Sequence, residues 1–359
     1  MHNEAGKPAD AEWLLAIRIR QLGDVLAALE ALRAMKAHRP ERKIAYVAQK
    51  NFHPLLEGLD FIDLLLPEPP RTDSLAGAHA YALYIARLRK LEPSAAIDFH
   101  GSVRSALVAF FSGAPVRVGF STRVPRYAYN VVETRGLFVD GRHVPRTAVD
   151  SGLSLAKHVG AAPGRNVLPE IVLDQSVIDR GRDALSGSGV PAEAIASGRV
   201  VGINPGRPYQ AKKWPRDRFQ DLARRLSQDG RHVVVMWGPG EEDAARAIAS
   251  RAGNSVTMAP SFDLETLAGV LRSLGSLITI DSGLKHLAVC MRVPTLSLFG
   301  ATDPSEWHMG TEFDDYLWKG LSCSPCRRLT CPFGAPCMDV PTDEVIGAFA
   351  AMELRRKVS

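Results

Sequence analysis

A carboxylate, a hydroxyl and a glycine, those of Asp281, Ser282 and Gly283, stand together at the start of a predicted helix, a position suited to binding an anion. They follow residues 277–280, a short run rich in β-branched side chains that is typical of a buried parallel strand. A helix that begins just past a strand presents unpaired backbone N–H groups at the positive end of its dipole, which suits phosphate. His286, four residues after Ser282, is expected on the same side of this helix. The alternative is an ordinary strand–helix unit in which Asp281 or Ser282 only caps the helix.

The carboxylate of Asp24 is a second candidate, because it follows Gly23 after a predicted strand over residues 13–19. In open α/β sheets, ligands bind outside the C-terminal ends of the strands. Glycine permits a ligand to approach closely, and a carboxylate at that edge can act as a general base. The alternative is an aspartate that caps the next helix.

A basic loop follows the predicted strand over residues 200–204 and carries Arg207, Lys212 and Lys213. Cations at the edge of a sheet would neutralise a diphosphate, although a solvated basic loop is the plainer interpretation. The chain has no Asp-x-Asp pair, which many sugar-nucleotide enzymes use to hold a divalent metal on the diphosphate. Helix N–H groups, lysine and arginine would therefore have to bind a diphosphate here.

Residues 238–243, with the sequence Gly-Pro-Gly-Glu-Glu-Asp, partly match the dinucleotide-binding fingerprint of oxidoreductases. Asp243 stands where the third glycine should be, and carboxylates at a helix start would repel a pyrophosphate. A carboxylate suits ribose hydroxyls better. The segment therefore argues against an oxidoreductase.

Four of the five cysteines, Cys323, Cys326, Cys331 and Cys337, lie within fifteen residues. Thiols clustered in this way in a cytosolic protein suggest a metal more than disulfides. A compact structural zinc site with four thiolate ligands is one interpretation, and free thiols are the other.

Composition narrows the class of protein. The chain has 359 residues, of which 46% are hydrophobic and 23% charged, as in soluble globular proteins of two domains.

No apolar run approaches the roughly 18 residues of a membrane span, and the polar N-terminus lacks a signal-peptide core, which predicts a cytoplasmic protein. The net charge of +5 favours anionic partners, including the inner membrane surface. No basic block or aromatic-rich basic stripe supports binding to nucleic acid.

Strands and helices alternate along the chain in two separate runs, which predicts two Rossmann-like domains with parallel sheets facing a central cleft. A Pro- and Gly-containing linker over residues 161–170 ends the first domain, predicted as residues 1–170. The second domain is predicted as residues 171–340, beginning with a strand over 171–174, and a C-terminal helix as 341–359. Residues 143–160 are expected to be helical.

Five segments together resemble the ADP-heptose:lipopolysaccharide heptosyltransferases of glycosyltransferase family 9. They occur in the family's order and cover most of the chain: RIRQLGDVLAALEALRAMK, IDFHGSVRSALVAFFSGAPVRVGF, INPGRPYQAKKWPRDRF, TIDSGLKHLAVCMRVPTLSLFGATDPSEW and CSPCRRLTCPFGAPCM. The combination of GDVL near the start, KKWP in the middle and DSGLKHLA before LFGATDP is highly specific. The resemblance implies a GT-B fold, with the donor bound by the C-terminal domain and the acceptor by the N-terminal one. It also implies an inverting transfer without an Asp-x-Asp metal.

The resemblance also assigns roles to individual residues. Asp24 would be the general base for the acceptor hydroxyl, and Lys212 would bind the donor phosphates. Asp281 would contact the donor sugar and Glu242 the adenosine ribose. His286 matches the motif histidine and would support the loop. The backbone N–H groups on the diphosphate would belong to Ser282, Gly283 and Leu284.

On the acceptor side the chain departs from the family pattern. Arg104 stands where the family usually has lysine, and His100 where it often has glutamine. Five residues are candidates to meet acceptor phosphates or carboxylates: Arg104, Arg123, Arg126, His143 and Arg146.

The sequence thus predicts an inverting enzyme that moves a heptose from ADP-heptose to an inner-core lipopolysaccharide acceptor, built on lipid A with Kdo or heptose. The acceptor could be the Kdo residue, the first heptose, a later core sugar or a protein. Peripheral contact with the inner face of the inner membrane is expected, and no cofactor for catalysis. The alternatives are a GT-B enzyme with another sugar nucleotide or acceptor, an epimerase, or a non-catalytic sugar-nucleotide-binding protein.

Overall fold

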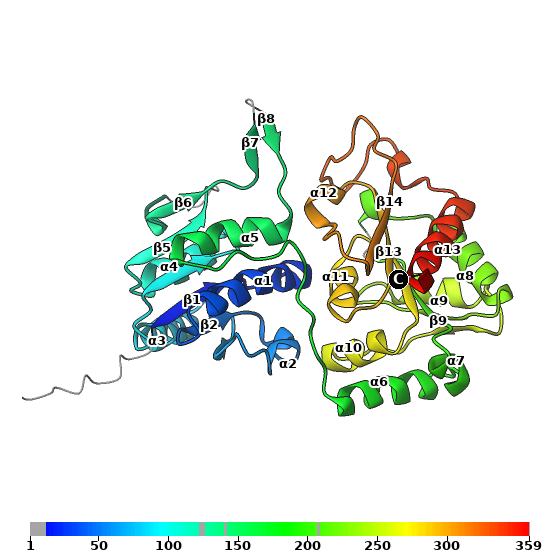
Figure 1. The fold of residues 1–359 in the computed structure, drawn as a ribbon, viewed down its shortest axis with the longest axis horizontal. Coiled ribbons are helices and arrows are strands. Elements are labelled where there is room, and N and C mark those ends of the chain that lie inside the picture. The colour runs from blue at the N-terminus through cyan, green and yellow to red at the C-terminus, as the bar shows by residue number, and fades with distance from the viewer. Residues whose placement is uncertain (1–11, 122–125, 140–141, 207–208, 359) are drawn as a thin grey trace, which may run out of the picture. The chain divides into compact units, whose positions relative to one another are not determined.

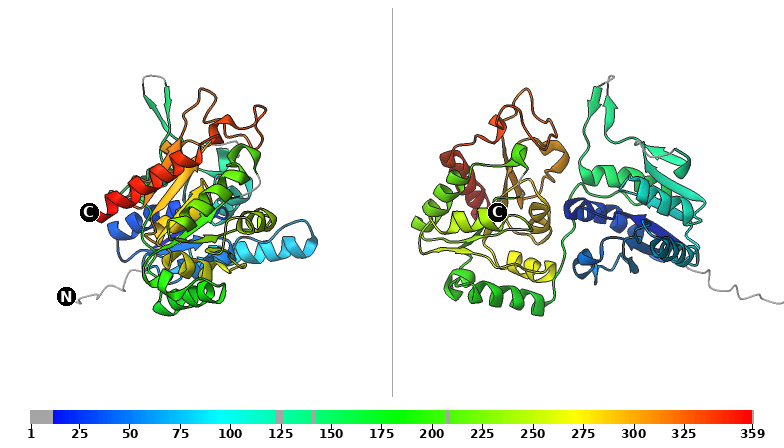
Figure 2. Two further views of the ribbon diagram at one scale, coloured as in Figure 1. Left: turned by 90° about the vertical axis from the view of Figure 1, so that its right-hand side faces the viewer. Right: turned by 180° about the vertical axis from the view of Figure 1, so that it is seen from behind.

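The computed structural model describes residues 12–121, 126–139, 142–206 and 209–358. The chain divides into two compact units, Met1–Asn166 and Val167–Ser359, each built around a six-stranded parallel sheet with helices on both faces (Figures 1 and 2). The boundary between the units lies inside the predicted linker at 161–170. The predicted α/β class with parallel sheets is confirmed.

The sheet of the first unit has the order β3-β2-β1-β4-β5-β6, with every neighbouring pair parallel. Because the order reverses between β1 and β4, the C-terminal ends of these two strands form a topological switch point, where such sheets bind ligands. The strands are β1 Trp13–Ile17, β2 Lys43–Val47, β3 Leu64–Leu66, β4 Ala95–Asp98, β5 Val116–Phe120 and β6 Val131–Glu133.

The helices of the first unit cover both faces of this sheet. Leu15 and Ile17 of β1 pack in one core with residues of α3 and α4, such as Leu88 and Ala106, while α1 packs with α5. The helices are α1 Leu22–His38, α2 His53–Leu56, α3 Leu75–Arg89, α4 Val103–Phe111 and α5 Ala148–Ala156, with 3-10 turns η1 Lys50–Phe52, η2 Arg126–Ala128 and η3 Lys157–Val159.

The prediction of one helix over residues 143–160 is wrong at its start. Two short antiparallel strands, β7 Leu137–Val139 and β8 Arg142–Val144, precede the helix and place His143 in a hairpin. Helix α5 begins only after Thr147, whose Oγ1 accepts a hydrogen bond of 2.9 Å from the Asp150 N–H as an N-cap. The sequence signal for the hairpin is an Asp-Gly pair between two short runs that contain valine.

The sheet of the second unit repeats the same order, β11-β10-β9-β12-β13-β14, again with all neighbours parallel. Its switch point therefore lies at the C-terminal ends of β9 and β12. The strands are β9 Val200–Asn204, β10 His232–Val235, β11 Val256–Met258, β12 Ser276–Ile280, β13 Thr295–Phe299 and β14 Asp314–Trp318. The expected strand over 171–174 is not formed.

The helices of the second unit pack on its two faces, and the last one belongs to this unit. Helix α13 packs against α8, β13 and β14, and its Phe349 joins a core with Phe219 of α8 and Ile203 of β9. The helices are α6 Gln175–Gly187, α7 Ala192–Ala196, α8 Arg216–Gln228, α9 Glu242–Ala249, α10 Leu264–Arg272, α11 Gly283–Cys290, α12 Pro304–Trp307 and α13 Thr342–Val358, with 3-10 turns η4 Gln210–Lys212 and η5 Pro336–Met338. Among the described residues, no helix is both long and apolar enough to cross a membrane.

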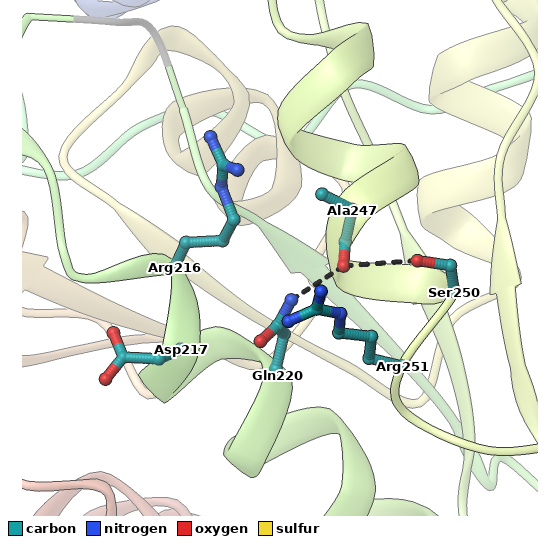
Figure 3. A pocket seen from close by; sticks show the side chains of 6 residues that line it. All are labelled: Arg216, Asp217, Gln220, Ala247, Ser250 and Arg251. Atoms are coloured by element: carbon teal, nitrogen blue, oxygen red, sulfur yellow. Dashed lines mark hydrogen bonds between the residues drawn. The ribbon is translucent and has the colours of Figure 1, made fainter.

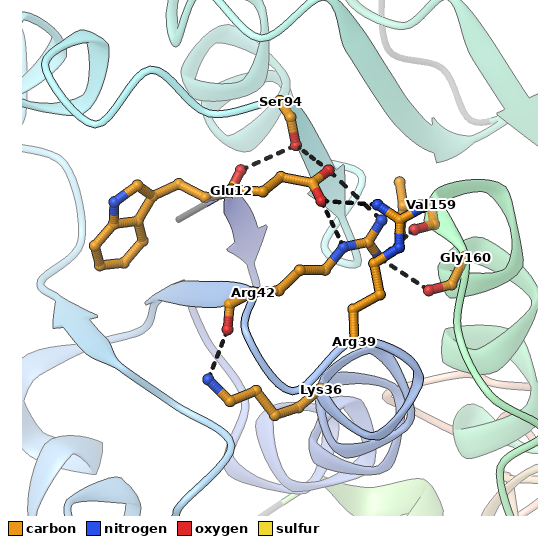
Figure 4. A network of polar contacts seen from close by, with 8 residues as sticks. Glu12, Lys36, Arg39, Arg42, Ser94, Val159 and Gly160 are labelled. Atoms are coloured by element: carbon orange, nitrogen blue, oxygen red, sulfur yellow. Dashed lines mark hydrogen bonds and ion pairs between the residues drawn. The ribbon is translucent and has the colours of Figure 1, made fainter. Parts of the chain in front are cut away.

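A polar network closes the N-terminal edge of the first sheet, opposite its switch point (Figure 4). Arg42, just before β2, is 5% exposed and its Nε contacts Glu12 Oε2 at 2.8 Å. The same guanidinium donates to the carbonyls of Val159 at 2.6 Å and Gly160 at 2.9 Å, while Ser94 Oγ donates to Glu12 Oε1 at 2.8 Å. This network joins β1, β2 and the end of the unit, and leaves the opposite edge for ligands.

Candidate active site

An ion pair occupies the switch point of the second sheet. Lys212 Nζ lies 2.7 Å from Asp281 Oδ2, and the two residues follow the neighbouring strands β9 and β12. Gly206 has a φ of +70°, and a Cβ there would lie 2.1 Å from Ile280 Cδ1, so glycine lets the loop after β9 pass β12. The Lys212 side chain is 27% exposed and that of Asp281 only 7%, so the ammonium is the member that faces solvent.

Asp281 is ionised although it is buried. Burial, the largest influence, raises the pKa of this carboxyl, but the charges of Lys212 and His286 and the hydrogen bonds from Lys212 and Thr302 outweigh it and hold the pKa below its usual range. Thr302 Oγ1, just after β13, donates to Asp281 Oδ2 at 2.7 Å. The sequence indicated Asp281 and Lys212 separately but neither their pairing nor Thr302.

Helix α11 begins next to this pair. Ser282 occupies the N-cap position with extended backbone, but its side chain makes no capping hydrogen bond. Its buried Oγ has no hydrogen-bond partner among the described residues. The N–H groups of the first turn, including those of Gly283 and Leu284, therefore keep their capacity to bind an anion at the positive end of the helix. The side-chain cap that the alternative interpretation assumes is absent from Ser282.

His286 lies inside the second unit rather than at its surface. It is 3% exposed, and its ring centroid is 5.3 Å from that of Trp307. Burial first, and then the charges of Lys285 and Lys212, lower the pKa of His286 to about 3, against the opposite effect of Asp281. The imidazole is therefore neutral at physiological pH and suited to supporting the α11 start rather than to moving protons.

A second ion pair in this region could not be foreseen from the sequence. Lys285 and Asp314 are each fully buried and their Nζ and Oδ2 atoms lie 2.9 Å apart. Lys285 Nζ also donates to the Trp307 carbonyl at 2.5 Å and lies 5.2 Å from the Phe299 ring centroid. Lysine is normally solvent-exposed, so nothing in its local sequence marks it as a core residue.

Glu242, the predicted ribose contact, is the first residue of α9 and its side chain is 49% exposed. Its Oε1 lies 2.5 Å from Arg246 Nη2, one helical turn away. The neighbouring Glu241 is buried, and its Oε2 accepts a hydrogen bond of 2.8 Å from the Gly238 N–H. Glu241 therefore shapes the turn, and the ribose role of Glu242 stays a prediction.

An ion pair between Asp24 and Arg18 occupies the switch point of the first sheet. Here the carboxylate is the more exposed partner, whereas in the Lys212–Asp281 pair it is the cation. Asp24, in the first turn of α1, has Oδ1 2.5 Å from Arg18 Nη2, and Arg18 follows β1. Arg18 Nη1 donates to the Phe99 carbonyl at 2.8 Å, which ties the guanidinium to the end of β4. The N-cap position of α1 is taken by Gln21 and not by Asp24, and the Asp24 contact found in the described part of the chain is the one through Oδ1. Arg18 thus holds one carboxylate oxygen of Asp24, and the other is left to contact a ligand.

His100 lies among arginines at the same edge. Its Nδ1 accepts a hydrogen bond of 3.2 Å from the Ile19 N–H. Burial lowers the pKa of His100 to about 4, and the charges of four arginines act in the same direction. These are Arg18, Arg20, Arg135 and Arg104. The field around His100 is therefore positive, as a site for an anionic acceptor requires.

The turn that carries His100 is held by a buried carboxylate. Asp98 Oδ1 accepts from the N–H groups of His100 at 2.8 Å and Gly101 at 3.0 Å, and its Oδ2 accepts from the Tyr129 hydroxyl at 2.6 Å. Burial, the largest influence, raises the pKa of Asp98 although these hydrogen bonds oppose it. Sequence analysis did not single out Asp98, Arg18, Arg20 or Arg135.

The other predicted acceptor residues fall into two groups. Arg146 lies 3.5 Å from Glu133, which also contacts His158 at 3.0 Å. Arg123 lies outside the described residues, and the side chains of Arg126 in η2 and His143 in β8 also lie outside the description. Their roles stay predictions.

The four clustered cysteines lie in one segment, residues 319–341, that has only the turn η5 as regular structure. Cys323 is exposed and Cys337 buried, and all the cysteines are free. Within the described ranges, no three His, Cys, Asp or Glu side chains are placed to hold a metal ion. Zinc binding by these four thiols therefore stays a prediction. The segment does support the donor side, since the Ala211 N–H, next to Lys212, donates to the Leu329 carbonyl at 3.2 Å.

A hollow of about 550 Å³ lies elsewhere in the second unit, between α8 and α9 (Figure 3). Gln220 Nε2 donates to the Ala247 carbonyl at 2.7 Å across it. None of the predicted site residues lines this hollow, which is surrounded by Arg216, Asp217, Gln220, Ala247, Ser250 and Arg251. We therefore do not assign the candidate site to it.

The chain resembles known proteins over most of its length. Residues 84–336 match the model of glycosyltransferase family 9 (heptosyltransferase). Lipopolysaccharide heptosyltransferase 1 of Pseudomonas aeruginosa is 26% identical over 351 residues, which cover 89% of this chain and 87% of that protein. Two solved structures share the fold. The family 9 glycosyltransferase of Veillonella parvula has a TM-score of 0.83 and 21% identity, covering 97% of this chain and 99% of that one. Escherichia coli ADP-heptose lps heptosyltransferase II has a TM-score of 0.77 and 19% identity, covering 96% and 99%.

These matches confirm the predicted GT-B fold of two Rossmann-like units. They also agree with the sequence motifs that lie at both switch points, GDVL at Asp24 and DSGLKH at α11. The family model covers more than half of the chain, so the assignment to the family does not depend on any one relative. The chain belongs to glycosyltransferase family 9, the heptosyltransferases.

Proposed function

We propose that this glycosyltransferase moves a heptose from ADP-heptose to an inner-core lipopolysaccharide acceptor, with inversion at the anomeric carbon. Family membership and the relative named as an ADP-heptose lps heptosyltransferase support the donor and the acceptor class. The single observation that carries the proposal is the exposed Lys212 ammonium beside the uncapped start of α11. Together they make a site for the diphosphate that leaves during the reaction.

On the donor side, breaking the sugar–phosphate bond places negative charge on the departing diphosphate. The N–H groups of Gly283 and Leu284 and the Lys212 ammonium would stabilise that charge more in the transition state than in the bound donor. Asp281 would hold Lys212 in place through the 2.7 Å contact and, through the small part of its side chain that is exposed, would contact the donor sugar. Glu242 would contact the adenosine ribose.

On the acceptor side, Asp24 would take the proton from the attacking hydroxyl. Arg18 fixes the carboxylate through Oδ1, which leaves Oδ2 for the hydroxyl. The alcohol oxygen attacks the anomeric carbon from the face opposite the diphosphate, so the new glycosidic bond has the inverted configuration. The arginines around His100 would bind the negative groups of the acceptor.

The test is product formation with ADP-heptose and a panel of acceptors that end at Kdo, at the first heptose or at a later core sugar. Mass spectrometry of the acceptor gives the added heptose, and NMR gives its anomeric configuration. Loss of donor without a heavier acceptor would indicate an epimerase, and ADP binding without any product would indicate a non-catalytic protein. Thermal shift with ADP, UDP and GDP identifies the base of the donor, because only the cognate nucleotide should stabilise the fold strongly.

We further propose that the reaction takes place on the inner face of the inner membrane, with the enzyme in the cytoplasm. The acceptor class supports this, because lipid A anchors the sugars to the bilayer. Recovery of the protein in the membrane fraction at low salt, and its release at high salt, would test peripheral attachment.

A further inference from the structure

Three aromatic side chains form an exposed patch on the first unit. Phe110 and Phe111 end α4 and Tyr127 lies in η2, with exposed fractions of 38%, 41% and 64%. The Phe110 ring contacts both others edge to face, at centroid distances of 5.2 Å to Phe111 and 5.7 Å to Tyr127. We call these three residues the aromatic patch. Scattered exposed hydrophobic residues are ordinary, whereas three contacting aromatic rings on one surface need a partner.

Arginines surround the aromatic patch. The Arg117 guanidinium lies 5.6 Å from the Phe110 ring centroid, and Arg89 Nε donates to the Phe111 carbonyl at 3.1 Å. The helices α3 and α4, which pack against each other, contain no aspartate or glutamate (Figure 1). The patch therefore combines aromatic rings with uncompensated positive charge, the combination that binds the headgroup layer of an anionic bilayer.

Helix α4 separates the patch from the acceptor edge of the first sheet. Helix α4 begins at Val103 beside the His100 turn, at the sheet edge that carries Asp24, and ends at the patch. Its nine residues span about 13 Å. Val103, 57% exposed, extends the apolar surface toward that edge. The sugars of a lipid-anchored acceptor would have to span at least this distance from a bilayer at the patch to reach Asp24.

We propose that the aromatic patch docks this enzyme on an anionic lipid bilayer, an inference that rests on the proposed use of a lipid-anchored acceptor. A second copy of the chain fits the patch less well, because a two-fold interface would place the same arginines opposite one another.

Vesicle sedimentation tests the proposal. The full chain is mixed with vesicles of phosphatidylethanolamine and phosphatidylglycerol, and separately with vesicles of phosphatidylcholine alone. We expect binding to the anionic vesicles that weakens in high salt, and weak binding to the neutral ones. Replacing Phe110, Phe111 and Tyr127 together by serine should lower partition into anionic vesicles by about tenfold or more, since each buried ring contributes to membrane affinity. The single change Arg89→Gln should lower it by about threefold to fivefold.

The matched control is the double change Val172→Ser and Leu354→Ser, which removes two exposed apolar side chains, 84% and 65% exposed, from the second unit. This control should bind vesicles like the unchanged protein. All variants should keep the unfolding temperature of the unchanged protein, because the altered side chains are exposed. Equal vesicle binding by the patch variant and the unchanged protein would overturn the proposal. So would a dimer in sedimentation velocity that the patch variant dissociates without any change in vesicle binding.

Activity separates this inference from the proposed function. The patch variant should lose transfer to an acceptor embedded in vesicles but keep transfer to the same acceptor after its acyl chains are removed. Loss of both transfers in a folded patch variant would place the patch in the active site and contradict a docking role. If the unchanged protein transfers heptose to neither acceptor, the proposed function fails, while vesicle binding still decides the role of the patch.

Discussion

The switch points of the two units carry ion pairs that are alike in position and opposite in burial. In the first unit Arg18 is the hidden partner, with 8% of its side chain exposed, and Asp24 is 28% exposed. In the second unit Asp281 is hidden at 7%, and Lys212 is 27% exposed. The two sheets have the same strand order, so the fold alone does not cause this difference.

Local hydrogen bonds decide which partner is buried. The Phe99 carbonyl at the end of β4 accepts a hydrogen bond from Arg18, so this cation is held by the protein and the Asp24 carboxylate is left to contact a ligand. Thr302 after β13 donates a hydrogen bond to Asp281, so this carboxylate is held mainly by the protein and the Lys212 cation is left to contact a ligand. One unit thus offers a base to an alcohol, and the other offers a positive charge to a phosphate.

The largest effect is expected from Asp24→Asn, which keeps the shape and removes the proton acceptor. We expect turnover to fall by about 10²–10⁴-fold, since general base catalysis contributes that much. ADP affinity should stay unchanged because the donor side is untouched. Undiminished transfer by the purified variant with its true substrates would remove Asp24 from the mechanism.

A third pair, Lys285–Asp314, extends the comparison because neither partner is exposed. We expect this pair to stabilise the fold and to take no part in catalysis. Lys285→Met is expected to lower the free energy of unfolding by about 3–5 kcal/mol, since it leaves Asp314 buried and unpaired. Denaturant titration measures this loss.

The double change Lys285→Met with Asp314→Leu should recover most of that stability, because it replaces the buried pair by apolar side chains of similar size. If the double variant is as unstable as the single one, repacking and not the lone charge explains the loss.

Lys212→Met probes the exposed cation of the second unit. We expect turnover to fall by about 10²–10³-fold, because the leaving diphosphate loses a charged partner, and ADP affinity to fall as well. Lys212→Arg should retain more activity than Lys212→Met. Transfer kinetics and calorimetric titration with ADP measure the two effects, and unchanged ADP affinity in Lys212→Met would place this cation outside the donor site.

The smallest effect concerns pH. The pKa of His286 is about 3 in the folded protein and 6.5 in the reference state, so the neutral form favours folding. Its contribution to stability is complete above pH 6.5 and is lost as the pH falls from 6.5 toward 3. Between pH 6.5 and 4.5 the loss for this one group is roughly 2–3 kcal/mol. His286→Gln should therefore lose less stability than the unchanged protein over that range in thermal or urea unfolding. Parallel curves for the two proteins would contradict the burial of a neutral imidazole.

Sequence reasoning found the residues whose signal is local. Asp24, Lys212 and the start of α11 each lie just after a strand, where a strand–turn–helix pattern is visible within about ten residues. It missed Arg18 as the partner of Asp24, because the strength of that contact depends on a carbonyl 81 residues away. It missed Lys285 because a buried lysine is chosen by a distant aspartate and not by its neighbours. Which member of each pair faces solvent is likewise a tertiary property.

The most direct test of the contrast between the two pairs is to measure turnover and ADP affinity side by side for Asp24→Asn and Lys212→Met. Both variants should lose turnover, but only Lys212→Met should lose ADP affinity. A loss of ADP affinity in Asp24→Asn equal to that in Lys212→Met would contradict the division of labour between the two units.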